Sequence, residues 1–204
     1  MAIGLKFRQT ADDLTGQSKW WGAPDLPEGW DYPCQGEDPL TFVCQIRCQD
    51  LAQFDKDGLL PKEGMLYFFA AIGEYVHKLD IVEAEHNGLG EWEADAYKVL
   101  YSPSCEDLSP FEVTYDDGEP AFLPAEAISF EEVESGAAEF KLLGRPYYDE
   151  VDELYPDYIN LLQIDESDEW GLVLYDCGMV NFLIKPEELK AGNWESAYCY
   201  FHSF

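Results

Sequence analysis

Basic residues are scarce in this sequence of 204 residues, which has 12 lysines and arginines against 42 aspartates and glutamates. The resulting formal net charge of −30 repels the phosphates of nucleic acids and the headgroups of anionic lipids. We therefore expect no nucleic-acid partner and no membrane partner. Two interpretations of the acidity stay open: it maintains solubility, or it attracts a cationic partner such as a basic protein.

Long apolar runs are also missing, because no stretch approaches the roughly 20 apolar residues that span a bilayer. The first six residues, MAIGLK, contain neither an apolar run nor the small-residue cleavage site of a secretion signal. We therefore expect a cytoplasmic location. Hydrophobic residues make up 47% of the chain and aromatic residues 15%, which is enough for a packed core. The sequence predicts a single domain over residues 1–204.

Potential metal ligands are few and badly spaced. The chain has six cysteines and three histidines, and several of the cysteines lie in apolar, strand-like runs, where a reduced cysteine packs as a small hydrophobic residue. Cys44 and Cys48 lack the second ligand pair of a zinc site. Asp55 and Asp57 lack the remaining ligands of a calcium loop. We expect free thiols, no metal site and no cofactor.

Catalytic signatures are absent as well: the sequence has no phosphate-binding loop, no nucleophile elbow and no dinucleotide fingerprint. It therefore nominates no catalytic residue and favours a non-enzymatic role. An enzyme stays open as an alternative, because catalytic groups meet in space rather than in sequence. The oligomeric state is not indicated.

The sequence does contain a short pattern of residues that occurs twice. Each copy reads as a strand, an insert, a glycine turn and an apolar strand, and the copies comprise residues 44–46 with 64–69 and residues 162–164 with 178–183. This repeated pattern predicts an α+β domain with a mostly antiparallel, twisted sheet, few short helices and internal pseudo-duplication. The related halves would span approximately 40–72 and 158–190.

Local patterns predict the remaining elements. Residues 65–72 and 179–183 are nearly all apolar and are expected as strands in the sheet interior. A short helix is expected near residues 148–154, and another between Pro186 and Gly192. Residues 18–33 are rich in proline and glycine and are expected as an ordered loop pinned by its tryptophans. Residues 111–115 are expected as a short strand.

Four residues are candidates for ligand binding: Gln45, Gln163, Arg145 and Trp170. The two glutamines occupy the same place in the two copies and would either line a pocket or satisfy backbone groups of loops in the core. Arg145 is the only basic residue between Lys141 and Lys185 and would bind either an internal carboxylate or an anionic ligand. A pocket near these four residues would suit an enzyme or a small-molecule binder.

Several segments in order resemble the bacterial YwqG-like family. These segments are residues 18–27, 39–46, 60–69, 142–146, 161–164 and 170–171 followed by 178–182. The resemblance covers nearly the whole chain and implies a mixed α+β fold in a domain of unknown function. The charge leads us to expect an acidic binding protein, immunity-type or regulatory, for a cationic partner.

Overall fold

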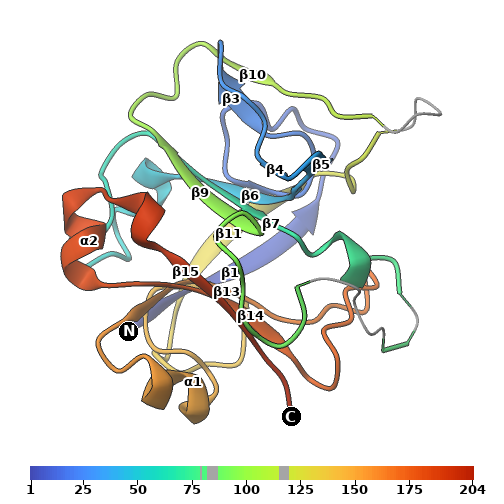
Figure 1. The fold of residues 1–204 in the computed structure, drawn as a ribbon. Coiled ribbons are helices and arrows are strands. Elements are labelled where there is room, and N and C mark those ends of the chain that lie inside the picture. Colours follow the sequence, from blue (N-terminus) through green and yellow to red (C-terminus); the bar gives the residue numbers. More distant parts are fainter. Residues whose placement is uncertain (79, 82–86, 115–119) are drawn as a thin grey trace.

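A computed structural model describes residues 1–78, 80–81, 87–114 and 120–204 of the chain (Figure 1). Its strands are β1 (Ala2–Gln9), β2 (Lys19–Trp20), β3 (Asp25–Pro27), β4 (Cys34–Gln35), β5 (Asp38–Pro39), β6 (Thr41–Arg47), β7 (Met65–Ala70), β8 (Gly90–Glu91), β9 (Tyr97–Ser102), β10 (Leu108–Pro110), β11 (Glu126–Val133), β12 (Lys141–Leu142), β13 (Ile159–Ile164), β14 (Met179–Ile184) and β15 (Tyr198–His202). Its helices are α1 (Asp149–Leu154) and α2 (Pro186–Ala191), with short 3-10 turns η1 (Cys48–Leu51), η2 (Gly73–Tyr75) and η3 (Trp194–Ser196).

Most of the strands form one eleven-stranded sheet in the order β8-β15-β14-β13-β12-β1-β11-β2-β6-β7-β9. Every ladder between the described strands of this sheet is antiparallel. Two smaller ladders, β10-β3 and β4-β5, lie outside it. The expected mostly antiparallel sheet with few short helices is therefore confirmed. Within the described residues, no helix is both long and apolar enough to cross a membrane.

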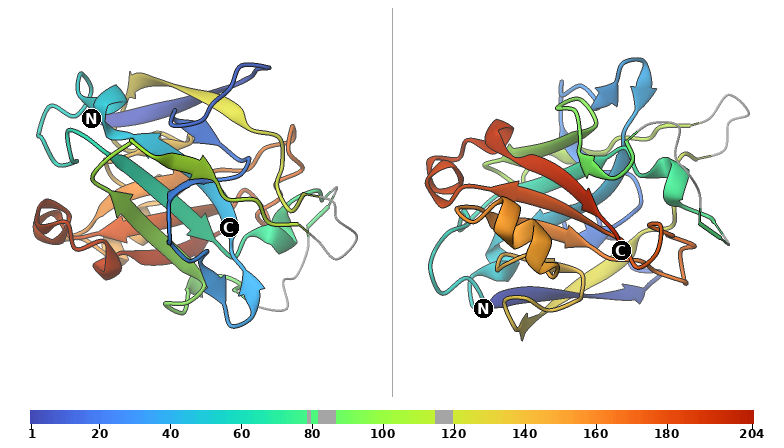
Figure 2. Two further views of the ribbon diagram at one scale, coloured as in Figure 1. Left: turned by 90° about the horizontal axis from the view of Figure 1, so that it is seen from above. Right: turned by 60° about the horizontal axis from the view of Figure 1, so that its bottom comes forward.

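The sheet curls around the main hydrophobic core (Figure 2). Phe68 of β7 and Phe182 of β14 come from opposite halves of the strand order, yet their ring centroids are 5.4 Å apart at an interplanar angle of 80°. Both side chains are completely buried. The contact is possible because the twist of a wide antiparallel sheet brings its two halves face to face.

Two smaller apolar clusters lie on the outer face of the sheet. One contains the outward side chains of β7 and is covered by the chain around Leu26 and Leu40. The other contains Met179 and Leu183 of β14 and is covered by Val151 of α1. Alternate residues of β7 and β14 therefore face apolar surroundings on both sides, which explains why these strands read as continuous apolar runs.

Several sequence predictions are confirmed by these elements. β7 and β14 lie in the sheet interior, each between two neighbouring strands. α1 occupies the predicted helical segment. α2 begins at Pro186 and ends before Gly192, which adopts the left-handed conformation with φ 69° that closes a helix C-terminus.

Other predictions are wrong. Residues 18–33 are not only loop, because β2 lies between β11 and β6 in the main sheet. This strand has only two residues, because the backbone turns directly after it at Trp21, with a φ of 57°. Residues 111–114 form no strand beyond one isolated bridge at Thr114, and their side chains are largely exposed. Tyr115, at the end of that expected strand, lies outside the described residues. β1 was not predicted, although Ile3, Leu5 and Phe7 alternate with other residues along it.

Candidate functional site

Gln45 is completely buried in β6 and anchors the chain that covers the outer face of the sheet. Its Oε1 accepts a hydrogen bond from the Asp25 backbone N–H at 2.9 Å. Its Nε2 donates to the Gln17 carbonyl at 2.9 Å and to Asp25 Oδ2 at 2.5 Å. All donors and acceptors of the amide are thus engaged by the protein itself, which matches the interpretation that this residue satisfies backbone groups.

Gln163 of β13 likewise forms hydrogen bonds with backbone groups of neighbouring loops. Its Oε1 accepts the Tyr147 backbone N–H at 3.0 Å, and its Nε2 donates to the carbonyls of Glu139 at 2.8 Å and Ala137 at 3.1 Å. The side chain is completely buried. Gln163 therefore anchors the connections on either side of β12 to the sheet.

Each glutamine lies beside a buried lysine. Lys19 is the cross-strand partner of Gln45, and Lys141 is that of Gln163. Lys19 Nζ lies 2.9 Å from Asp25 Oδ2, with side chains 6% and 0% exposed, so this ion pair is sequestered from water. The sequence did not predict this ion pair, because the spacing of Lys19 and Asp25 does not distinguish a buried ion pair from an exposed one.

Lys141 has a different environment. Its Nζ donates to the Ala137 carbonyl at 2.5 Å, and no carboxylate of the described residues lies within ion-pair distance. Burial, with a smaller contribution from the charge of Arg145, lowers the pKa of Lys141 to about 8. The ammonium group of Lys141 therefore destabilises the fold at neutral pH.

Trp170 lies in an aromatic cluster at the centre of the molecule. Its ring stacks on Trp20 with centroids 5.8 Å apart and an angle of 20°, and it meets Phe7, Trp21 and Phe140 edge to face. The indole Nε1 donates to Glu126 Oε1 at 2.9 Å. The ring is 6% exposed, so its faces are occupied by the protein.

Arg145 forms an internal ion pair. Its Nη1 lies 3.0 Å from Asp152 Oδ2 of α1, with side chains 57% and 26% exposed. It lines a shallow cavity of about 430 Å³ together with Met1 and Phe54. Gln45, Gln163 and Trp170 do not line that cavity, so the structure does not bring the four predicted residues together around one space.

The described cysteines and histidines likewise form no cluster that could hold a metal ion. All six cysteines are free, and Cys44, Cys48 and Cys199 are buried. Burial raises the pKa of the Cys44 and Cys199 thiols well above the usual range and that of Cys48 to about 12. Within the described residues, no group of three or more histidine, cysteine or acidic side chains has the geometry to hold a metal ion.

Several cavities adjoin one another across the start of β6, and we call this concave region the β6 groove. It consists of four adjoining cavities that share lining residues, with Leu40, Thr41 and Phe42 at the floor. Their volumes are about 360, 530, 180 and 380 Å³ in order along the groove. This length suits an extended chain better than a compact small molecule.

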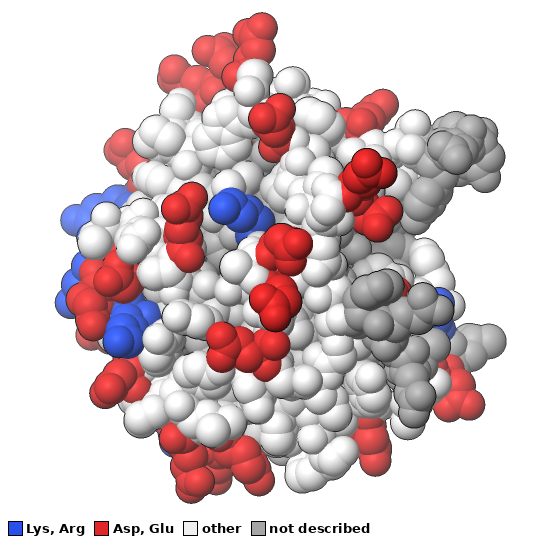
Figure 3. All heavy atoms as spheres, viewed as in Figure 1, with Lys and Arg blue, Asp and Glu red and all other residues white. Residues whose placement is uncertain are grey.

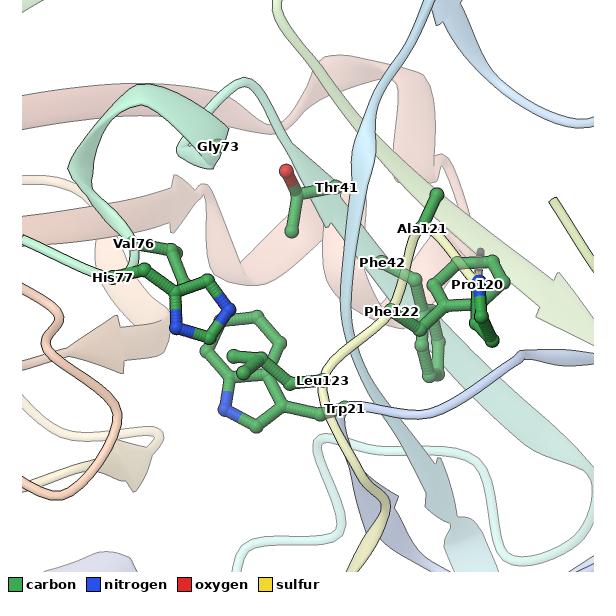
Figure 4. Close-up of a pocket in the computed structure, with 10 residues that line it drawn as sticks. All are labelled: Trp21, Thr41, Phe42, Gly73, Val76, His77, Pro120, Ala121, Phe122 and Leu123. Carbon is green, nitrogen blue, oxygen red and sulfur yellow. The ribbon is translucent and has the colours of Figure 1, made fainter. Parts of the chain in front are cut away.

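The smallest of these four cavities by volume is shown in Figure 4. Trp21, His77 and Leu123 form one wall, Phe42 and Phe122 lie on the other side, and the Thr41 hydroxyl lies between the two groups. Most of its lining residues are apolar, and its side-chain hydrogen-bonding groups are the Thr41 hydroxyl, the His77 imidazole and the Trp21 indole Nε1, which has no hydrogen-bond partner among the described residues. This part of the groove therefore offers both apolar contacts and hydrogen-bonding groups.

The rest of the groove has several carboxylates among its lining residues. Its acidic lining residues are Asp31, Asp38, Glu74, Asp95 and Glu112. The only lysine or arginine among the described lining residues is Lys98, whose Nζ lies 3.7 Å from Glu195. Asp95 Oδ1 accepts a hydrogen bond from Gln35 Nε2 at 3.2 Å, which ties the β4-β5 hairpin to the opposite rim. The groove thus combines an apolar floor with a negative rim.

This groove was not predicted from the sequence. Its described lining comes from segments around residues 21–23, 31–42, 71–77, 87, 94–100, 112–114 and 120–125, which the fold brings together and no motif connects. Over the face shown in Figure 3, carboxylates are spread widely, whereas basic side chains gather mainly at the left edge.

Comparison with known proteins gives a family but no activity. No curated protein matches the chain. A protein-family model described as a domain of unknown function, DUF1963, matches residues 18–142 and 127–202. These two segments include most of the main sheet, from β2 to β15. The chain therefore belongs to the DUF1963 family of domains of unknown function.

Proposed function

We propose that this protein is a non-enzymatic binding protein whose β6 groove receives an extended, basic segment of a partner protein. The observation that carries the proposal is the combination of an apolar floor, formed by Leu40 and Phe42, with the carboxylates of Asp31, Asp38 and Asp95. An extended strand places alternate side chains on opposite faces. In a segment that alternates apolar and basic residues, the apolar side chains would pack on the floor of the groove, and the basic side chains would neutralise the carboxylates at its rim.

The distribution of charge supports a cationic partner. Among the described residues, only Asp25 and Glu126 are buried acids, and Lys19 and Lys141 are buried bases. The described core therefore buries as many positive as negative charges, and the excess of acidic residues lies at the surface of the described residues. Such a surface accelerates encounter with a basic protein and disfavours nucleic acid. A cytoplasmic, immunity-type or regulatory role and an affiliation to the bacterial YwqG-like proteins form part of this proposal.

We further propose that the domain consists of two related halves. In both ladders, β6-β7 and β13-β14, the register shifts just before the glutamine, between Phe42 and Cys44 and between Asn160 and Leu162. Gln45 and Gln163 each accept a backbone N–H from the chain that follows the lysine-bearing strand.

The backbone after those strands also supports this proposal. Trp21 and Leu143 both have positive φ angles, 57° and 62°, and each is followed by a glycine with positive φ, Gly22 at 75° and Gly144 at 82°. Positive φ is uncommon for tryptophan and leucine, so its occurrence at two corresponding corners favours a common origin over coincidence.

A peptide-binding experiment tests the groove. We expect a fluorescent ten-residue peptide of alternating lysine and leucine to bind, and the double variant Asp38→Asn with Asp95→Asn to weaken binding about fivefold. This value corresponds to two exposed ion pairs of about 0.5 kcal/mol each. Fluorescence anisotropy at low ionic strength measures the dissociation constant.

The matched control is Asp57→Asn with Glu63→Gln, which removes the same amount of charge from exposed positions that do not line the groove. We expect less than a twofold change for this control. Equal weakening by both double variants would show that the peptide responds only to net charge, and would overturn the assignment of the groove.

The surface charge also predicts that salt stabilises the native protein. Folding concentrates like charges that an unfolded chain spreads apart, so screening should raise the melting temperature. The Debye length falls from about 30 Å at 0.01 M to about 8 Å at 0.15 M salt. Thermal melts over this range of sodium chloride should therefore show a steady increase, and a flat melting temperature would mean that self-repulsion is not significant in the folded state.

A further inference from the structure

A second surface, away from the β6 groove, presents four tyrosines side by side. We call it the tyrosine surface; it consists of Tyr155 and Tyr158, which follow α1, and Tyr198 and Tyr200 of β15. The ring centroids of Tyr200 and Tyr155 are 5.5 Å apart, those of Tyr155 and Tyr158 are 5.4 Å apart, and those of Tyr158 and Tyr198 are 5.7 Å apart. Figure 2 shows α1 lying over this outer side of the sheet.

The four rings are only partly covered. Tyr198 is 37% exposed, the other three are intermediate, and Leu154 beside Tyr155 is 59% exposed. Tyr155, Tyr158 and Tyr200 pack on one side against the apolar cluster of Val151, Met179 and Leu183. Because they are only partly buried there, the tyrosine surface leaves area in contact with solvent, which is typical of binding surfaces.

The charges around these rings point to a cationic ligand. The Lys185 ammonium already lies 5.5 Å from the centroid of the Tyr158 ring, so one cation of the protein itself uses this surface. The Tyr155 hydroxyl donates to Glu91 Oε2 at 2.9 Å. Glu91 and Glu187 both act electrostatically on Tyr158. Aromatic faces and carboxylates therefore occur together.

We propose that the tyrosine surface binds arginine side chains of a basic protein partner. A guanidinium group is planar and stacks on aromatic rings, while its N–H groups form paired hydrogen bonds with a carboxylate such as Glu91. A lysine ammonium makes the same charge interaction without the planar stacking. The surface therefore distinguishes arginine from lysine, which net acidity does not. The proposal shares the cationic partner of the proposed function and uses none of the groove residues.

The test compares two labelled peptides of equal charge, one with six arginines and one with six lysines, each spaced by glycine. We expect the arginine peptide to bind wild-type protein at least threefold more tightly than the lysine peptide. Tyr198→Ala should weaken arginine-peptide binding about fivefold, consistent with the loss of one cation–π contact. It should change lysine-peptide binding less than twofold.

Tyr147→Ala is the matched control. Tyr147 is 42% exposed, and its ring packs on Tyr148 rather than on the four tyrosines. We expect less than a twofold effect on the arginine peptide. Tyr155→Phe keeps the ring and removes the hydrogen bond to Glu91, so it separates the aromatic contact from that hydrogen bond and should retain the arginine preference.

Three results would overturn the proposal: equal affinity of the two peptides for wild type, equal effects of Tyr198→Ala and Tyr147→Ala, or loss of the arginine preference in Tyr155→Phe. The groove variant Asp38→Asn with Asp95→Asn separates the two sites. If that variant keeps the arginine preference, the tyrosine surface acts by itself, whether or not the β6 groove binds its own peptide. If it abolishes the preference, the peptide lies in the groove and the tyrosine surface is excluded.

Discussion

Truncation of Phe68 or Phe182 to alanine should lower the free energy of unfolding by about 3–5 kcal/mol, as expected for a fully buried phenylalanine. Both side chains are completely buried, and each removal leaves a cavity that the curled sheet cannot close without distorting its ladders. Urea denaturation followed by circular dichroism measures the loss. Phe111→Ala, at a side chain 36% exposed, is the control and should cost less than about 1 kcal/mol.

The double variant Phe68→Ala with Phe182→Ala tests whether the curled sheet brings β7 into contact with β14. The two rings meet edge to face at 5.4 Å, and such aromatic pairs contribute about 0.5–1.5 kcal/mol beyond their burial. We therefore expect the double variant to lose less stability than the sum of the single variants, by about that amount. Strict additivity would contradict a direct contact and with it the closing of β7 onto β14.

The strands of this fold were predictable where burial is two-sided. β7 and β14 read as unbroken apolar runs because they face the main core on one side and an outer cluster on the other. β2 was not predicted because its two residues lie at the start of a Pro- and Gly-rich segment. Its pairing partners on the two sides, β11 and β6, come from other parts of the chain. Tertiary pairing overrode local propensity there.

Functional residues were less predictable than the fold. Gln45 and Gln163 both form hydrogen bonds with backbone groups of loops, but a sequence does not tell whether an amide faces a ligand or a loop backbone. The β6 groove and the tyrosine surface both arise from segments far apart in the chain, such as Glu91 and Tyr155. Neither has a spacing that a motif search would detect.

The two buried lysines should respond oppositely to replacement by methionine. Lys19→Met leaves the Asp25 carboxylate, which is 0% exposed, without its cation, and removal of one partner from a buried ion pair typically costs about 3–5 kcal/mol. Lys141→Met removes an ammonium group that has only a carbonyl partner, so it should be neutral or stabilising at pH 7. Urea denaturation of the two variants measures both effects, and similar losses would contradict the different environments of these lysines.

The pH dependence of the difference between wild type and Lys141→Met isolates this lysine from the other titrating groups. Its pKa is lowered from 10.5 to about 8 in the folded protein, so the unfolded chain binds the proton more tightly. The destabilisation by Lys141 is therefore complete below pH 8, diminishes as the pH rises, and vanishes above about 10.5, where both states are neutral. The advantage of Lys141→Met should follow the same course. A difference that stays constant between pH 7 and 10 would show that Lys141 is exposed to solvent or paired with a carboxylate.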